Sequence, residues 1–137
     1  MAVVGELLRS EADGTISFGN HKLAEKAKVE DFQHAGDILK VKTYSAMTKL
    51  EKNGMFLYES VPGTSVLNFS EKENGVEFVV EGDEDAQITI GLTDDTEYEV
   101  FVDGKSTGTM KTGLGGKLSL SVELETAGEV PVKVERV

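Results

Sequence analysis

Asn-Gly and Asp-Gly pairs between alternating segments constrain the fold of this chain most strongly. Asn53-Gly54, Asn74-Gly75 and Asp103-Gly104 each separate segments in which apolar and polar residues alternate with a period of two. Such pairs supply the positive φ angles that a type I′ turn needs, and the alternation is that of strands with one buried face. The sequence therefore predicts successive hairpins and an antiparallel all-β fold.

Several segments carry this alternation and predict the buried faces of strands. Because such strands recur every roughly 8 to 12 residues, we expect a β-sandwich or a jelly-roll-like pair of sheets, with at most one short helix. Pro131 suggests that the last strand lies at a sheet edge. The residues expected to point inward are Leu39, Val41, Thr43, Val76, Phe78, Val80, Leu118, Leu120, Val122, Leu124, Val130, Val132 and Val134.

Simple two-residue turns also predict which residues lie opposite one another. A turn at Asn53-Gly54 sets Leu50 opposite Leu57 and Lys49 opposite Tyr58, which places Phe56 and Tyr58 together on the outer face of the hairpin. We therefore expect either that the hairpin is covered on both faces or that these two aromatic residues contact a partner. The turn at Asn74-Gly75 pairs Phe69 with Val80 in the same way.

One segment, Lys22 to Lys28, has a helical composition. It is too short for an independently stable helix, so one helical turn and an irregular link are both open.

Length and composition predict one domain, residues 1–137, with a sub-sheet division near residues 81–86. Cysteine is absent, which excludes disulfides and thiolate metal sites. The first residues lack the basic and apolar regions of a secretion signal, and no segment approaches the roughly 20 apolar residues that cross a bilayer. We therefore expect a cytoplasmic protein.

The formal net charge of −11 argues against nucleic acid and membrane surfaces as partners, since clustered Lys and Arg bind both. From Glu71 to Asp103 the only base is Lys72, and mutual repulsion predicts raised carboxyl pKa values there. Two loops in this region could offer oxygen ligands to calcium, although acidic turns are the alternative interpretation. The candidate ligands are Asp83, Asp85, Asp94 and Asp95.

No catalytic motif stands out. The two histidines, His21 and His34, are expected to be ordinary loop or surface residues, and the sequence predicts no catalytic residue. The glycine-rich segment Gly113 to Gly116 lacks the Lys-Ser or Lys-Thr and the helix of a phosphate-binding loop, so it is expected to be a flexible turn.

The stretches Asp13–Asn20, Lys49–Met55 and Gly115–Leu124 resemble a group of short bacterial proteins described as endosialidases. This resemblance carries over no site residue, because the arginine-rich sialate-binding machinery of the phage tailspike enzymes has no counterpart here. The stretch Tyr98–Lys105 is similar to immunoglobulin-like modules attached to carbohydrate-active enzymes, which implies a fold more than a function.

Two functions follow as expectations. The first is a non-catalytic structural or binding module that self-associates into a homo-oligomer or filament, with no cofactor. The alternative, which the resemblance implies, is a glycan-binding or small carbohydrate-active protein.

Overall fold

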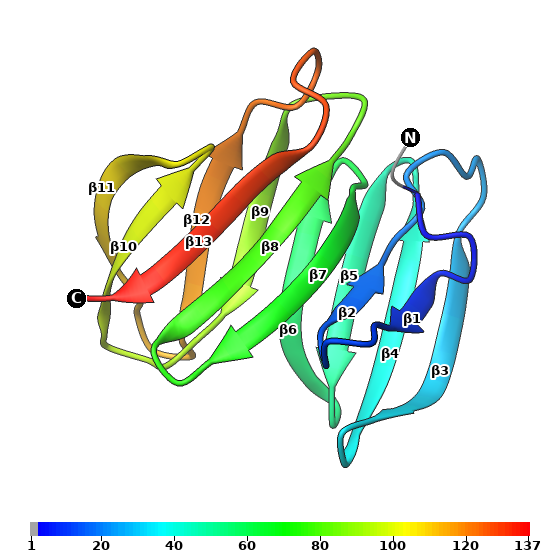
Figure 1. The fold of residues 1–137 in the computed structure, drawn as a ribbon, viewed down its shortest axis with the longest axis horizontal. Helices are drawn as coiled ribbons and strands as arrows, with labels where there is room; N and C mark the ends of the chain where they lie inside the picture. Colours follow the sequence, from blue (N-terminus) through cyan, green and yellow to red (C-terminus); the bar gives the residue numbers. More distant parts are fainter. Residues whose placement is uncertain (1–2) are drawn as a thin grey trace.

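The chain folds into two antiparallel β-sheets that pack face to face (Figure 1). The computed structural model describes residues 3–137, and within this range it contains thirteen strands and no helix. The predicted all-β sandwich is confirmed.

The larger sheet has seven strands and carries the chain's C-terminal strand near its middle. Its outer edges are β1 and β11. In spatial order its strands are β1 (Leu8–Ser10), β2 (Ile16–Phe18), β7 (Ser65–Lys72), β8 (Gly75–Glu81), β13 (Val130–Arg136), β10 (Glu97–Val102) and β11 (Lys105–Lys111).

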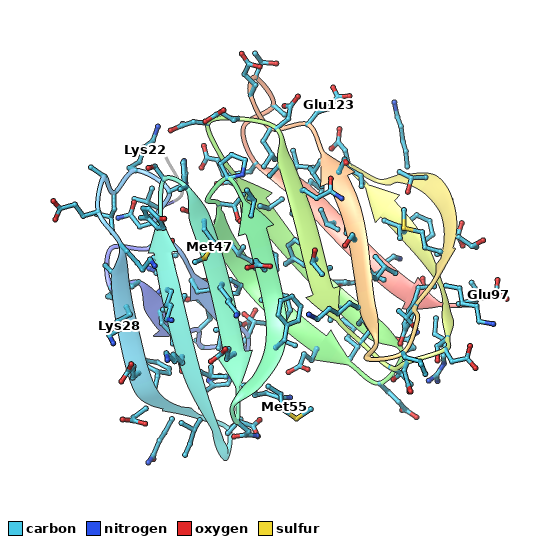
Figure 2. The ribbon with its side chains drawn as sticks, turned by 180° about the vertical axis from the view of Figure 1, so that it is seen from behind. Lys22, Lys28, Met47, Met55, Glu97 and Glu123 are labelled. Atoms are coloured by element: carbon cyan, nitrogen blue, oxygen red, sulfur yellow. The ribbon has the colours of Figure 1, made fainter. Side chains whose placement is uncertain are left out.

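The smaller sheet has six strands, with β12 and β3 at its edges, and lies in front in the view of Figure 2. At residues 82–85 the chain passes from the larger sheet into this one. In spatial order its strands are β12 (Lys117–Val122), β9 (Ala86–Gly91), β6 (Met55–Val61), β5 (Met47–Lys52), β4 (Asp37–Tyr44) and β3 (Ala27–His34).

The inner faces of both sheets share one apolar core, and every residue predicted to point inward is buried. At its centre lie aromatic rings in edge-to-face contact, with 5.2 Å between the centroids of Phe18 and Tyr58 and 5.6 Å between those of Tyr58 and Phe78. Such pairs add about 0.5–1.5 kcal/mol each beyond the area that they bury.

Two of the three predicted turns are confirmed. Asn53 and Gly54 have φ angles of 53° and 78°, and Asp103 and Gly104 have 54° and 80°, the positive values that a type I′ turn requires.

The third predicted turn is displaced by one residue. Lys72 pairs with Gly75, so Glu73 and Asn74 form the turn and Gly75 begins β8. A Cβ atom on Gly75 would lie 1.8 Å from the carbonyl oxygen of Val134 in the neighbouring strand. Glycine is therefore needed for the close approach of two strands rather than for the turn. The predicted Phe69–Val80 pair is also wrong, because the displaced turn and a register shift between Leu67 and Ser70 together place Val66 opposite Val80.

The predicted position of Tyr58 on the outer face of the hairpin is wrong. Glu51 pairs with Phe56, but a register shift between Leu50 and Glu51 places Leu50 opposite Tyr58 rather than opposite Leu57. This bulge turns Tyr58 into the core, where it is fully buried. One inserted residue reverses the face of each residue that follows it, so only Phe56 of the predicted aromatic pair remains on the outer face.

Pro131 does not mark a sheet edge, because β13 lies between β8 and β10. The carbonyl of Pro131 accepts a hydrogen bond of 2.8 Å from the amide of Asp103, the first residue after β10. The missing proline N–H thus falls at the end of the β10–β13 ladder, where it disrupts little pairing.

Of the two interpretations of Lys22–Lys28, the structure shows the irregular link, which leads into β3 at Ala27.

Candidate interaction surface

An apolar groove lies on the outer face of the seven-stranded sheet, the face turned toward the viewer in Figure 1. It has a volume of about 510 Å³, within the range of sites that bind ligands or side chains. We call it the outer groove. It is lined by Asn68, Glu77, Phe78, Val79, Phe101, Gly104, Pro131, Val132 and Lys133.

Strand alternation places apolar residues on this outer face. Val79 and Pro131 lie directly opposite each other on β8 and β13, and each is flanked by buried neighbours that point the other way. On a solvated face such positions are usually polar. Because these residues are apolar, a partner that covers them and removes them from water lowers the free energy.

Charged and aromatic residues form one side of the groove. Lys133 lies opposite both Glu77 on β8 and Phe101 on β10. Its Nζ atom lies 4.8 Å from the centroid of the Phe101 ring and 3.6 Å from a carboxylate oxygen of Glu135. The Lys133 side chain therefore partly covers the ring with a cation–π contact.

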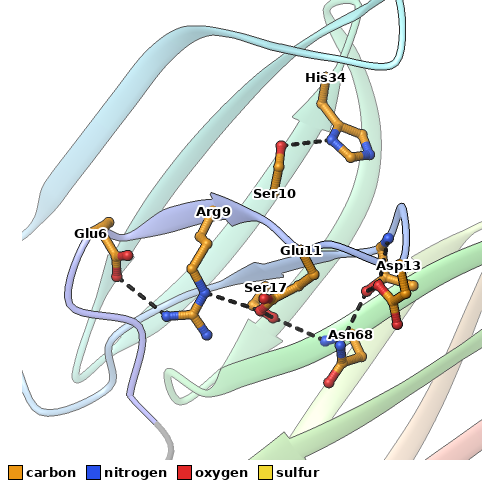
Figure 3. A network of polar contacts seen from close by, with 9 residues as sticks. Glu6, Arg9, Ser10, Glu11, Asp13, Ser17, His34 and Asn68 are labelled. Carbon is orange, nitrogen blue, oxygen red and sulfur yellow. Dashed lines mark hydrogen bonds and ion pairs between the residues drawn. The ribbon is translucent and has the colours of Figure 1, made fainter.

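Asn68, another lining residue, is held by a polar network that joins β1 and β2 to β7 (Figure 3). Asn68 has a φ of 55° at the bulge in β7, and its backbone amide donates to the hydroxyl of Ser17 at 3.0 Å. Glu11 in turn accepts from Ser17 and from Arg9, and these bonds hold the pKa of Glu11 below its ordinary value. The network fixes the bulge that borders the groove.

The connection between β11 and β12 projects an apolar side chain. Leu114 is 95% exposed, the highest exposure among the large apolar residues in the described part of the chain. The Gly116 amide donates to the Gly113 carbonyl at 3.2 Å, and Gly115 has a φ of 94°. The predicted turn is therefore present, with Leu114 at its second position.

The sheet edges differ in how they are protected. β1 has three residues, and the pairings of β3 and β11 contain register shifts. β12 pairs regularly with β9 over its whole length, so its free edge is the least protected. However, the larger sheet has one strand more, and its edge strand β11 extends past β12 in Figure 2. A sheet that approached the free edge of β12 would therefore meet β11.

Phe56, the remaining predicted interaction residue, is half-buried on the outer face of the six-stranded sheet. The Nζ atom of Lys117 lies 4.7 Å from the centroid of its ring. Phe56 thus lies on the opposite side of the sandwich from the outer groove, and its role in binding stays a prediction.

The four aspartates predicted as calcium ligands do not form one site. Their two loops precede and follow β9, so they lie at opposite ends of a six-residue strand. Asp85 accepts hydrogen bonds from the backbone amides of Leu124 and Glu125, and Asp95 pairs with Lys111 at 3.2 Å. Among residues 3–137, no group of three or more acidic or histidine side chains is placed to hold a metal ion.

The predicted rise in carboxyl pKa values is wrong for Asp83. Its carboxylate accepts a hydrogen bond of 2.6 Å from Lys22, which lowers the pKa of Asp83. The folded chain brings lysines from outside the acidic segment to its carboxylates, including Lys52 to Glu71 at 2.8 Å. Counting charges along the sequence therefore overstates the repulsion between these carboxylates in the folded protein.

His21 lies in the loop between β2 and β3, as predicted, but its side chain is buried rather than on the surface. Its Nδ1 atom lies 2.7 Å from the hydroxyl of Ser65, and its Nε2 atom lies 3.6 Å from Asp83. This arrangement places a serine, a histidine and an aspartate in series, but Ser65 is fully buried and its hydroxyl is closed to a substrate. Burial lowers the pKa of His21.

His34 makes a second serine contact at the edge of the sandwich. Its Nε2 atom lies 3.0 Å from the carbonyl oxygen of Gly14, which can only accept, so Nε2 carries the proton in the neutral ring. Nδ1 then accepts from the Ser10 hydroxyl at 2.7 Å (Figure 3). The contact fastens β1 of one sheet to the end of β3 in the other.

The comparisons with known proteins leave the class of protein defined by the fold alone, an all-β two-sheet sandwich. No protein-family model, curated protein or solved structure matches this chain. In residues 3–137, no helix has the length and apolar character that crossing a membrane requires.

Proposed function

We propose that this protein is a non-catalytic structural or binding module that self-associates into a homo-oligomer or filament. The observation that carries the proposal is the outer groove, whose apolar residues lie on the outward face of central strands. An apolar groove on an otherwise charged surface marks a site for a partner.

The serine–histidine contacts support a non-catalytic role. Ser65 is enclosed in the core, and His34 directs both ring nitrogens to atoms that hold β1 in place. Both histidines thus have structural roles that account for their positions.

The experiment is to place a carboxylate in the groove and measure molar mass by light scattering over a range of concentrations. We expect wild-type protein to exceed the monomer mass and Val79→Glu to shift toward the monomer. Thr89→Glu is the matched control, because Thr89 also lies half-buried on the outer face of a central strand, in the other sheet.

A wild-type protein that stays monomeric at every concentration would remove the proposal. If Phe56→Ala weakens association and Val79→Glu does not, the contact lies on the six-stranded sheet and the groove is the wrong surface.

A further inference from the structure

The free edge of β12 offers a row of backbone groups to a further strand. The amide of Leu92 donates to the carbonyl of Gly116 at 2.7 Å, in register with the β9–β12 ladder. In an antiparallel pair every second residue directs its N–H and C=O toward the neighbouring strand, so the residues between direct theirs away from it. The N–H and C=O groups of Lys117, Ser119 and Ser121 therefore point away from β9, to a side where no strand of residues 3–137 lies.

β11 covers the space beside this edge. The larger sheet has one strand more than the smaller sheet, and β11 is the strand that extends past β12 (Figure 2). Met110 and Gly108 of β11 lie opposite the buried residues Tyr98 and Val100, so they face toward the other sheet. Met110 is nevertheless only partly buried, and a Cβ atom on Gly108 would meet nothing within 4 Å. The space beneath β11 and beside β12 is therefore open, and we call it the strand site.

The strand site fits one extended strand better than a second sandwich. A whole sheet that approached the edge of β12 would meet β11, whereas a single strand lies beneath β11 as a further strand of the smaller sheet. β12 has six residues, and a strand of that length buries less than the roughly 1,200–2,000 Å² of a stable protein interface. The site is therefore suited to a peptide that binds reversibly rather than to a permanent contact between two copies.

We propose that the strand site binds an extended peptide segment of a partner protein, which becomes the seventh strand of the smaller sheet. The peptide pairs with β12 in the antiparallel sense, as β9 does on the other side. Its apolar side chains occupy alternate positions and point beneath β11 toward Met110, while its polar side chains lie on the outer face beside Ser119 and Ser121. The inference goes beyond self-association, because the outer groove lies on the opposite face of the larger sheet.

Charge does not select the peptide at the strand site. Residues of both signs lie on β11, β12 and the segments next to them, and Lys111 pairs with Asp95 at 3.2 Å. These residues are Asp94, Asp95, Asp103, Lys105, Lys111, Lys117 and Glu123. The backbone edge of β12 and the apolar space beneath β11 therefore decide which segments bind.

The first test uses a capped peptide of alternating threonine and valine residues, with a charged residue at each end for solubility. We expect saturable shifts of the Ser119 and Ser121 amide signals when NMR follows its titration into the labelled wild-type chain. In antiparallel pairing the residues opposite Ser119 and Ser121 are threonines whose N–H groups point to β12. N-methylation of the threonines should therefore weaken binding roughly tenfold or more, whereas N-methylation of the valines should leave it near that of the parent peptide.

The second test changes the edge of β12. Ser119→Pro removes one N–H from the free edge and no hydrogen bond to β9, so the variant should fold and bind the peptide roughly tenfold more weakly. Ser121→Pro is a second substitution of the same kind. Ser119→Ala is the matched control, because it keeps the N–H and should bind like wild type. Val79→Glu, which changes the outer groove, should also bind like wild type, and circular dichroism verifies that each variant folds.

Three results would overturn the strand site and leave the proposed self-association standing. One is a parent peptide that shifts no amide signal of β12. Another is equal binding of the two N-methylated peptides. The third is a folded Ser119→Pro or Ser121→Pro protein that binds the peptide like wild type.

Measuring self-association of the same variants separates the two proposals. If the peptide does not bind and Ser119→Pro reduces self-association, the edge of β12 is a contact between copies and the peptide proposal is wrong. If the chain is monomeric at every concentration and the peptide binds as described, the strand site stands and the proposed self-association fails.

Discussion

The phenol oxygen of Tyr58 lies 2.8 Å from the hydroxyl oxygen of Thr64, and both side chains are fully buried. Thr64 also lies 2.7 Å from the Ser60 hydroxyl, and its carbonyl accepts from Thr48 at 2.7 Å. Buried hydroxyls are tolerated only when they are hydrogen-bonded, and these contacts satisfy them at the point where β6 leads into β7. The residue that the sequence placed on the surface therefore has a structural role.

We predict that Tyr58→Phe lowers the free energy of unfolding by about 1 kcal/mol, near the low end for a buried hydrogen bond. The loss is small because Thr64 keeps its contact with Ser60. Urea unfolding measures this change, and light scattering should show unchanged association. A variant that is as stable as wild type but associates less would restore Tyr58 as a surface contact.

His21 predicts a loss of stability in mild acid. Burial lowers its folded pKa below the ordinary value of 6.5, so the unfolded chain binds the proton more readily. Above pH 6.5 the protonation of His21 costs no stability, and below that value the stability falls as the pH drops toward the folded pKa of His21. We expect the melting temperature of wild type to fall below about pH 6.5, and His21→Gln to fall less over the same range.

The control for His21 is His34→Gln, which removes the other histidine. Losses from Asp83, whose pKa is lowered, begin only below its ordinary value of 3.8 and so fall in a separate range. Identical pH profiles for wild type and His21→Gln between pH 7 and 5 would show that His21 does not cause the acid loss.

Gly75 and Gly54 should differ sharply when replaced by alanine. At Gly54 a Cβ atom meets nothing within 4 Å, so only the positive φ of 78° opposes it, at about 1–2 kcal/mol. At Gly75 the same atom would lie 1.8 Å from the Val134 carbonyl, which forces β8 and β13 apart. We expect Gly75→Ala to lower the unfolding free energy further than Gly54→Ala. Equal losses in chemical denaturation would contradict the tight β8–β13 approach.

Calcium should stabilise this protein no more than magnesium does. The four aspartates lie at both ends of β9, so neither loop gathers the six to eight oxygen ligands that calcium prefers. Because the net charge is −11, we expect the melting temperature to rise with NaCl up to about 0.15 M through screening. A larger rise with calcium than with magnesium at equal ionic strength would indicate a specific site.

Local patterns in the sequence were sufficient to predict the fold class and the buried faces. The alternation in Leu118, Leu120 and Val122 depends only on neighbouring residues, and each is buried as predicted. Bulges are not visible in such a pattern, because the extra residue at the β5–β6 pair is set by what the core accommodates around Tyr58.

The outer groove was beyond sequence analysis for a different reason. Asn68, Val79, Phe101 and Pro131 come from four strands that become neighbours only through the order of the sheet. A weak signal was present in Val79 and Pro131, apolar residues at positions where the alternation expects polar ones. Leu114 was passed over because its glycine neighbours suggested a flexible turn.

Sedimentation velocity of the wild-type chain over a wide concentration range tests the central claim most directly. Self-association through complementary surfaces predicts a weight-average sedimentation coefficient that rises with concentration above that of a 14.8 kDa monomer, without a plateau at a dimer if the contacts continue. A single monomer boundary at every concentration would contradict the account.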